Sequence, residues 1–376
     1  KGGRIVSATL KDYKNQEGEP LVLFNEEESA MNFAFEGKNE NILTEDMFFQ
    51  PINVSDSTVT MRLATTGAGY IDFAYRLLPE SYMVDFSIRA NGMQNFFPAA
   101  QKTLNIEWYQ RARQQEKGFD FEQRYTSLTY KPVDDGSDYL SEMREEKEAI
   151  EEPLEWIAFK NQFFSSVLIA QNNFENAVLE SVPQEKGSGF MKNYTAEMTT
   201  SFDPTGKEAT NFQFYLGPNH FKTLLASNDL CINKNEDPEL EDLVYLGWPL
   251  IRWINRWFTI NLFDWLSGWG LNMGIVLLLM TLIVKALVYP ATYKSFISSA
   301  KMRALRPYIQ KINEKYPKQE DALKKQQETM ALYSQYGVSP MGGCLPMLIQ
   351  MPVFMALFFF VPNAIELRHP RFLWAP

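Results

Sequence analysis

The stretch GIVLLLMTLIVKALVYP, from Gly274 to Pro290, decides the class of this protein. It lies within a predicted transmembrane helix at 271–292, because about 20 apolar residues at about 1.5 Å per residue cross about 30 Å of hydrocarbon. Lys285 interrupts the apolar run. A charge inside a membrane is costly and usually faces a water-filled cavity, although a lysine near the boundary can extend its ammonium group to the interface. Lys285 is therefore a candidate functional residue, with interfacial placement as the alternative.

A second apolar segment, 339–362, is predicted to form another transmembrane helix. Ser339 and Pro340 provide a helix cap followed by a first-turn proline. Pro346 and Pro352 predict a bent helix, whose freed backbone groups must pack against neighbours or border a wet cavity. Residues 363–376 are then expected to form a loop on the other side of the membrane from the segment between the two spans, and the family resemblance given below implies that this is a periplasmic loop.

Charge predicts how these segments are oriented. The chain has a formal net charge of −10, yet residues 291–336 hold nine Lys or Arg against four Asp or Glu. Because basic loops between spans stay on the cytoplasmic side, we expect a cytoplasmic helical hairpin at 295–337 and, before the first span, a domain on the opposite face of the membrane. A nucleic-acid surface is disfavoured, because the basic island lies between two apolar runs. The predicted coiled-coil seam of the hairpin is Met302, Leu305, Ile309, Ile312 and Tyr316, with Leu323, Met330 and Tyr333 on the returning helix.

Residues 1–240 have the pattern of β structure. Apolar and polar residues alternate in 58–63, 71–75 and 84–89, which predicts adjacent strands with one buried and one wet face. Further strands are expected at TLNIEWY, SSVLIAQ, YTAEMTTSF and NFQFYLGP. So many strands over more than 200 residues favour a large antiparallel sandwich. The first 230 residues contain no cysteine, so this domain folds without a disulfide, and the acidic stretch 134–153 is expected to be a solvated insertion.

A tryptophan-rich amphipathic helix is predicted at 245–268. Six of the eight tryptophans lie at or beyond Trp248. Such a helix suits the headgroup layer of a membrane, and the alternative is an ordinary packing helix. Its predicted narrow polar stripe consists of Arg252, Asn255, Arg256 and Thr259.

Several segments resemble the YidC/Oxa/Alb family of membrane protein insertases. TMALYSQYGVSPMGG and GGCLPMLIQMPVFMALFF resemble the second conserved span, AKMRALRPYIQKINEKY the start of the cytoplasmic hairpin, and YLGWPLIRWINRWF the interfacial helix. LPESYMVDFSI and EWIAFKNQFFSSVL are similar to parts of the periplasmic domain of the Gram-negative branch, whose fold is a β super-sandwich. The family has five conserved spans after an N-terminal helix, so we expect a truncated chain that lacks an upstream segment and ends before the remaining helices.

The resemblance implies a hydrophilic groove, open to the cytoplasm and to lipid, that holds the polar tail of an incoming protein. Thr281, one turn before Lys285, shares its face, and the resemblance places Lys285, Thr281 and Gln350 in this groove. For Gln350, hydrogen bonding between helices is an equal alternative. The family usually has arginine where Lys285 stands, so a permanent charge is less assured here. The residues expected to contact the client helix are Pro346, Met351 and Phe354.

The function implied is a membrane protein insertase and chaperone of the bacterial inner membrane. Its implied partners are nascent inner-membrane proteins, the lipid bilayer, the Sec translocon and the ribosome, with no nucleic acid bound directly. We expect no catalytic residue, cofactor or metal, because His220 and His369 are far apart and no G-x-S-x-G, P-loop or zinc-spaced Cys/His motif occurs. The alternative is a membrane-tethered periplasmic module that binds carbohydrate or protein. Deleting residues 1–230 would abolish the function of such a module but spare an insertase core.

Overall fold

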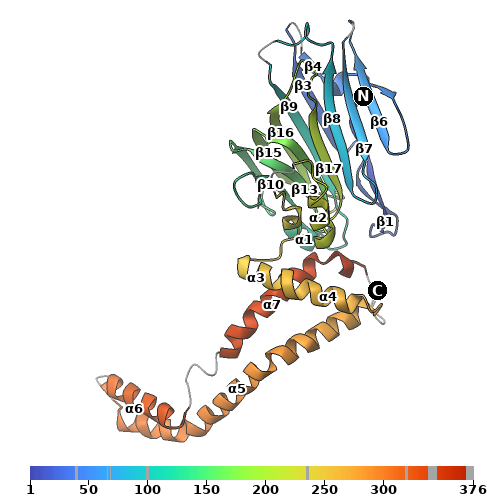
Figure 1. Ribbon diagram of the computed structural model, residues 1–376. Helices are drawn as coiled ribbons and strands as arrows, with labels where there is room; N and C mark the ends of the chain where they lie inside the picture. The colour runs from blue at the N-terminus through green and yellow to red at the C-terminus, as the bar shows by residue number, and fades with distance from the viewer. Residues whose placement is uncertain are drawn as a thin grey trace. The chain divides into compact units, whose positions relative to one another are not determined.

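The fold is taken from a computed structural model of the chain, in which two compact units, Lys1–Val244 and Tyr245–Pro376, are distinguished (Figure 1). The first unit consists mainly of β-strands and the second of helices, so the predicted change of class near residue 240 is confirmed. The residues described are 1–38, 41–65, 67, 69–98, 101–233, 237–317, 321–337 and 345–369.

The first unit contains two large antiparallel sheets and a short two-stranded one. In spatial order, the nine-stranded sheet consists of β11 (Asp138–Tyr139), β10 (Ser127–Pro132), β13 (Leu154–Lys160), β14 (Phe164–Phe174), β17 (Thr210–Pro218), β8 (Met83–Asn91), β7 (Tyr70–Leu77), β6 (Thr58–Ala64) and β5 (Gln50–Ile52). The six-stranded sheet consists of β12 (Glu146–Ile150), β15 (Asn176–Pro183), β16 (Phe190–Ser201), β9 (Thr103–Arg113), β3 (Ser29–Glu36) and β4 (Asn41–Leu43). The small sheet pairs β1 (Ala8–Lys14) with β2 (Pro20–Phe24).

The core of this unit lies between the two large sheets, as in a sandwich. Phe33 on β3 contacts Phe73 and Phe86 of the other sheet, with ring centroids 5.1 and 5.6 Å apart. Trp108 on β9 stacks on Phe159 of β13 at 3.8 Å. These buried aromatic pairs join the sheets, each contributing about 0.5–1.5 kcal/mol beyond the area that it buries.

The predicted adjacent strands around residues 58–89 are confirmed as β6, β7 and β8. Val59 pairs with Tyr75, and Tyr75 with Phe86, so their side chains lie on one face. The acidic segment 134–153 is not only the solvated insertion that we expected. Part of it forms β12, which pairs with β15 at the edge of the six-stranded sheet. Its charged side chains remain exposed, as is usual where an edge strand must resist pairing with other chains.

Short helices complete the first unit. They are η1 (Thr44–Asp46), α1 (Phe119–Glu122), η2 (Gln123–Tyr125), α2 (Phe221–Asn228) and η3 (Leu240–Leu243). Leu224 of α2 and Leu240 of η3 are fully buried. Trp156 on β13 is also fully buried and donates a hydrogen bond from its indole nitrogen to the carbonyl of Pro238, 2.6 Å away. The segment 237–243 is therefore an integral part of the β unit.

The second unit contains longer helices. They are α3 (Pro249–Ile254), the π-helical turn η4 (Asn255–Thr259), α4 (Ile260–Ser267), α5 (Met273–Lys315), α6 (Ala322–Gln335), α7 (Leu345–Asn363) and the turn η7 (Ile365–Leu367). Within the described residues, Met273–Pro290 is long and apolar enough to cross a membrane, whereas Gln350–Asn363 is a shorter apolar stretch. The expected start of the second span at Ser339 and Pro340 lies outside the described residues.

Two predictions about the helices need correction. The predicted first span and first hairpin arm are one continuous helix, α5, which contains Pro290 and Pro307. In the helix around residues 249–267, Asn255 and Thr259 are buried rather than part of a wet stripe, while Trp253 and Trp257 are exposed. The π turn lies at these residues, and the Asn255 side-chain amide donates to the carbonyl of Leu246 at 2.9 Å, which holds this face inward.

The C-terminal part of α5 pairs with α6. Lys315 forms a 2.6 Å ion pair with Glu328, whose carboxylate also accepts a hydrogen bond from the Tyr316 hydroxyl at 2.8 Å. Leu305, from the predicted seam, is buried. Leu323 and Met330 of α6 are instead largely exposed, whereas Tyr333 is partly buried, so the predicted coiled-coil seam is not confirmed on this helix.

Candidate functional site

The membrane-crossing part of α5 has one face packed within the helical unit. Val276, Met280 and Val284 are buried at a spacing of four residues. Asn272 caps the helix, since its side chain accepts a hydrogen bond from the Gly274 amide at 3.0 Å. The remaining faces of α5 expose large apolar side chains, as expected for a helix in contact with lipid. Among these are Leu278, Leu282 and Leu287.

Lys285 and Thr281 lie on the exposed part of this helix, one turn apart. The Thr281 hydroxyl donates to the carbonyl of Leu277 at 2.8 Å, so its polar hydrogen is satisfied within the helix and it adds little cost in an apolar setting. Lys285 forms no hydrogen bond or ion pair with another residue in the described part of the chain. The predicted shared face of the two residues is confirmed, and their place in a groove remains a prediction.

The α7 residues proposed from the sequence have different exposures. Gln350 is partly buried, and no hydrogen bond joins it to Lys285 or Thr281 within the described residues. Met351 and Phe354 are each about half exposed, at 51 and 49%. Pro346 falls within α7, but its side chain lies outside the described residues. Whether these α7 residues and Lys285 and Thr281 form one site therefore stays a prediction.

An exposed apolar stripe runs along α7. Its members recur at intervals of three or four residues, which places them on one helix face. They are Leu348, Met351, Phe354, Phe358 and Val361. Ala356 and Phe360 on another face are buried, and Phe360 packs against Phe263 of α4 with ring centroids 5.2 Å apart. The inner face therefore anchors α7 and leaves the stripe free for lipid or another apolar helix.

Two buried asparagines fix α7 and η4, and the sequence analysis missed this role. Asn363 donates from its amide to the carbonyls of Tyr245 at 3.0 Å and Phe359 at 2.9 Å. Asn255 makes the corresponding bond to Leu246. Both bonds satisfy backbone carbonyls at the start of the unit. A lone asparagine within an apolar helix was the available signal, since it needs a partner when buried.

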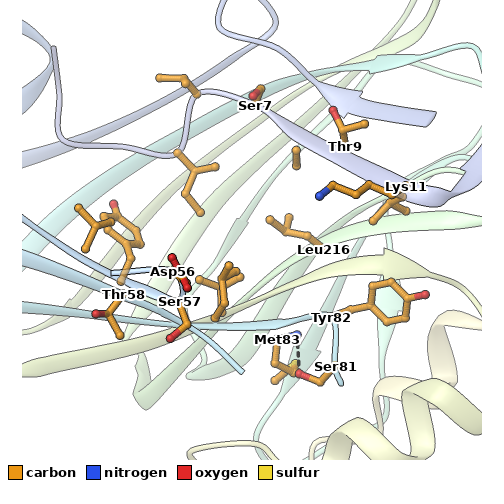
Figure 2. Close-up of a pocket in the computed structure, with 18 of the residues that line it drawn as sticks. Ser7, Thr9, Lys11, Asp56, Ser57, Thr58, Ser81, Tyr82, Met83 and Leu216 are labelled. Atoms are coloured by element: carbon orange, nitrogen blue, oxygen red, sulfur yellow. Dashed lines mark hydrogen bonds between the residues drawn. The ribbon is translucent and has the colours of Figure 1, made fainter. Parts of the chain in front are cut away.

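The β unit contains a cavity of about 810 Å³ between the N-terminal segment and the nine-stranded sheet. Figure 2 shows Thr9 and Lys11 on one side of this cavity and Leu216 and Met83 on the other. Its lining residues are all described, and they include no histidine, cysteine or glutamate. The cavity therefore contains no Ser–His–Asp or Cys–His arrangement.

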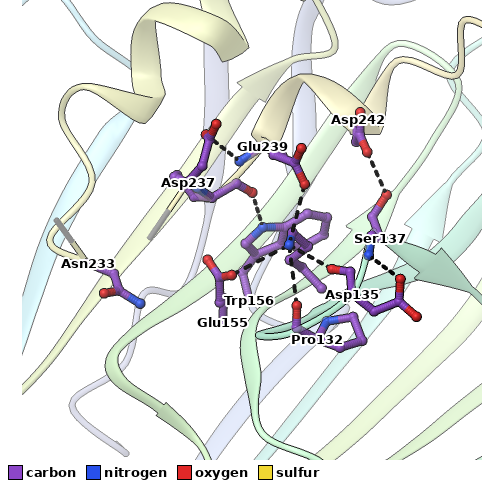
Figure 3. Close-up of polar contacts among 12 residues, drawn as sticks. Pro132, Asp135, Ser137, Glu155, Trp156, Asn233, Asp237, Glu239 and Asp242 are labelled. Carbon is purple, nitrogen blue, oxygen red and sulfur yellow. Dashed lines mark hydrogen bonds and ion pairs between the residues drawn. The ribbon is translucent and has the colours of Figure 1, made fainter. Parts of the chain in front are cut away.

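Lys131 is the centre of a buried ionic cluster, whose partners Glu155, Glu239 and Asp135 are labelled in Figure 3. The Lys131 ammonium lies 3.6 Å from the Glu155 carboxylate and 3.4 Å from that of Glu239, and it donates to the carbonyl of Asp135 at 2.7 Å. Lys131 and Glu155 are almost completely buried. The cluster joins β10 and β13 to the segment 237–243, which is a structural arrangement rather than a reactive one.

Two further lysines are buried in the same unit. Burial lowers the pKa of Lys160 to about 8, although the nearby Glu142 carboxylate opposes the shift. Burial likewise lowers the pKa of Lys192 to about 8, against Glu142 and Glu146. Desolvation raises the pKa of Glu142 in turn. The Lys192 ammonium donates to the carbonyl of Ser141 at 2.7 Å, so the acidic segment covers these lysines.

Cysteine and metal chemistry find no support within the described residues. No group of three or more His, Cys, Asp or Glu side chains among them could hold a metal ion. Cys231 is free and buried, and burial raises the pKa of its thiol to about 12, so it is a poor nucleophile. The His220 ring lies 2.7 Å from the Thr223 hydroxyl.

Comparison with known proteins identifies a membrane protein with a periplasmic domain. Residues 1–260 match the family described as YidC periplasmic domain, and residues 265–376 match the 60Kd inner membrane protein family. The chain belongs to the YidC family. Proteins named membrane protein insertase YidC match all of it, with 76% identity in Phocaeicola vulgatus, 58% in Bacteroides fragilis and 47% in Parabacteroides distasonis. The chain spans about 60% of the length of the first two relatives and 59% of the third.

These matches place the protein in the bacterial inner membrane, with its β unit in the periplasm. They also agree with the family resemblance found from the sequence. They do not test the individual groove and client-contact residues.

Proposed function

We propose that the helical unit of this chain handles clients as part of a membrane protein insertase of the inner membrane. The observation that carries the proposal is the single cation, Lys285, on the exposed part of an otherwise apolar span, with Thr281 one turn away. A lysine deep in a span is costly unless it meets water, so its presence points to a hydrated path. The names of the relatives support the same activity.

The mechanism follows from the two kinds of surface. Lys285, Thr281 and Gln350 would line a water-containing groove that receives the polar tail of a client. Met351 and Phe354, with Pro346, would contact its apolar helix. The groove would lower the barrier because the tail crosses less bare hydrocarbon. Partitioning of the apolar helix would supply the driving force, at about 25 cal/mol per Å² removed from water.

The remaining partners follow from charge and position. The basic hairpin of α5 and α6 would lie on the cytoplasmic side, where it could meet ribosomes, and its predicted seam would act as a short coiled coil. The tryptophans exposed on α3, η4 and α4 would lie in the headgroup layer. Cooperation with the Sec translocon belongs to this proposal as well.

Insertion into proteoliposomes tests the groove. The full-length protein that contains this chain would be reconstituted as wild type, Lys285→Ala, Lys285→Arg and Lys285→Glu, and the client would be a single-span protein with an acidic N-terminal tail. Arg should retain insertion, Ala should lower the rate about tenfold, and Glu should lower it further, because the charge meets the tail in a poorly screened setting. Lys301→Ala, in the hairpin, is the matched control for loss of a positive charge.

Equal insertion by all four proteins would show that Lys285 only reaches to the interface, and the groove assignment would be wrong. A second client with a neutral tail distinguishes two effects of Lys285, its attraction for an acidic tail and its hydration of the groove. If Lys285→Ala slows both clients equally, hydration of the groove matters more than attraction.

A further inference from the structure

The outer face of the nine-stranded sheet contains a polar trough that the proposed insertase does not use. The strands β6, β7, β8 and β17 are neighbours in this sheet (Figure 1). Thr60, Ala74, Ser87 and Asn211 are successive pairing partners on them, so they form one row across the strands. The Asn211 side-chain amide donates to the Gln171 side chain of β14 at 2.7 Å, which extends the row to a fifth strand. Four strand spacings of about 4.8 Å give the row a length of about 19 Å.

The middle of this row is low, because Ala74 and Ser87 have small side chains. They form the floor of a cavity of about 590 Å³. That volume lies within the range of about 300–1,000 Å³ that is usual for ligand pockets. The hollow is therefore a consequence of strand register and side-chain size.

One wall of the trough is a rigid set of charged side chains. The Arg62 guanidinium holds both oxygens of the Asp72 carboxylate at 2.7 Å and lies 3.6 Å from the centre of the Tyr70 ring. Asp72 is thus oriented before any ligand arrives. Arg89 on β8 is the cross-strand partner of Asp72 and lines the cavity, and it forms no ion pair within the described part of the chain.

A tight turn supplies the other charged groups. The Asp203 carboxylate accepts hydrogen bonds from the amides of Thr205 and Glu208, at 2.8 and 2.9 Å, and from the Thr205 hydroxyl. The Glu208 amide is the largest cause of a lowered Asp203 pKa. Gly206 has a φ of +74° and lies so close to the Ala90 carbonyl that a Cβ would overlap it. The turn therefore holds the cavity-lining residues Lys207 and Glu208 in place.

The lining groups define the chemical class of the ligand. Two cations, Arg89 and Lys207, balance two carboxylates, Asp72 and Glu208, so neither a strong anion nor a strong cation is favoured. An apolar ligand would desolvate these groups without giving them hydrogen bonds. The amide and hydroxyl groups that remain both donate and accept hydrogen bonds. They belong to Asn53, Gln171, Asn172, Asn211, Thr60 and Ser87.

We propose that this trough binds a linear oligosaccharide, with N-acetylated hexosamine units as the best match. Ring hydroxyls offer closely spaced donors and acceptors, and acetamido groups pair with side-chain amides. An extended peptide fits less well. Peptides usually join a sheet at a strand edge, whereas this row runs across the strands, where the backbone groups are already paired.

Binding of chitotetraose, the tetramer of N-acetylglucosamine, tests the proposal. The whole chain would be held in micelles of a detergent without a sugar headgroup, and binding would be followed by calorimetry and ligand-observed NMR. We expect saturable binding with a Kd of about 1 mM or lower, and weaker binding of the monosaccharide. Ser87→Trp fills the floor and should weaken binding at least about tenfold. Glu197→Trp, at an exposed position of the other large sheet, is the matched control and should bind as wild type.

Thermal melting of each variant ensures that lost binding reflects the trough rather than unfolding. Failure of wild type to bind chitotetraose, or equal binding by a folded Ser87→Trp variant, would overturn the proposal. Binding of an extended Ala/Ser peptide instead, lost in Ser87→Trp, would assign the trough to a protein partner and also overturn it. The readout does not involve insertion, so either result leaves the insertase proposal standing.

Discussion

At the scale of single residues, buried lysines show how one side chain can have different roles. Lys131 has carboxylates within 3.6 Å and stays in an ionic cluster. Lys160 and Lys192 have weaker compensation, so burial lowers the pKa of each to about 8. A buried ammonium that can lose its proton links the stability of the β unit to pH.

The contribution of Lys160 and Lys192 to the stability of the β unit should therefore rise with pH above about 8. The buried Cys231 thiol opposes this rise above about pH 9, because burial raises its pKa to about 12. Between about pH 8 and 10.5 the unfolded lysines bind protons that the folded ones do not, so raising the pH favours the folded state. A difference of about 2.5 pKa units corresponds to about 3 kcal/mol for each lysine, fully gained only near pH 10.5. Well below pH 8 both lysines are protonated in the folded and in the unfolded state. There they do not make the free energy of unfolding depend on pH. Urea unfolding at several pH values measures the effect.

Lys160→Met should remove the contribution of Lys160 to the rise of the free energy of unfolding with pH. It should also increase the stability of the β unit at pH 7, because a buried charge disappears. Lys147→Met is the matched control, since Lys147 is exposed and pairs with Glu180 at 3.6 Å. An unchanged slope in Lys160→Met would show that Lys160 does not titrate in this range.

The residues predictable from sequence were those that break a pattern. Lys285 interrupts an apolar run and was found for that reason. The burial of Lys192 was not predicted, although Lys192 lies on the same face of its strand as Tyr194, Ala196 and Met198, which are all buried. Asn255 belongs to the predicted polar stripe, yet it is buried. Helical spacing alone does not show which side of an amphipathic helix packs against neighbouring elements.

At the scale of elements, the ion pairs of Lys131 are one of the contacts between the segment 237–243 and the sheet. Lys131→Met leaves the Glu155 carboxylate buried without its cation, which costs about 3–5 kcal/mol. We expect the β unit to lose stability by about this amount. We also expect the amides of Asp242 and Val244, which now bond to the carbonyls of Glu239 and Glu241, to exchange hydrogen faster.

Hydrogen exchange measured by mass spectrometry checks this expectation. Lys147→Met again provides the control, because breaking an exposed pair costs about 0–1 kcal/mol. Persistent protection at Asp242 and Val244 in Lys131→Met would mean that the buried Trp156 and its hydrogen bond to Pro238 hold the segment without the ionic cluster.

Elements with strict alternation were the most predictable. The strands β6, β7 and β8 follow the period of two, and their register follows from the buried face. The continuity of α5 through Pro290 was not predictable, because a proline more often ends a helix than lies within it. The edge strand β12 was hidden by its charge, since its burial does not alternate and its backbone pairing leaves no sequence signal.

At the scale of the whole molecule, each unit displays a different surface. The β unit carries most of the acidic residues and a polar trough, whereas the helical unit exposes tryptophans and apolar stripes. The change of composition near residue 240 predicted this division. Whether Lys285 and Gln350 meet cannot be read from the sequence, because they are 65 positions apart and packing between helices decides it.

Photo-crosslinking from α7 tests whether its exposed stripe contacts clients. A photoreactive phenylalanine derivative at Phe354, which is 49% exposed, should label the apolar helix of a client during insertion by the full-length protein. The same derivative at Phe360, which is 6% exposed and packs against Phe263, should not. Methionine and phenylalanine provide an adaptable apolar surface for different clients, so clients with different apolar sequences should also be labelled from Met351. Labelling by lipid alone at Met351 and Phe354 would identify the stripe as an ordinary bilayer contact and would move the client path away from α7.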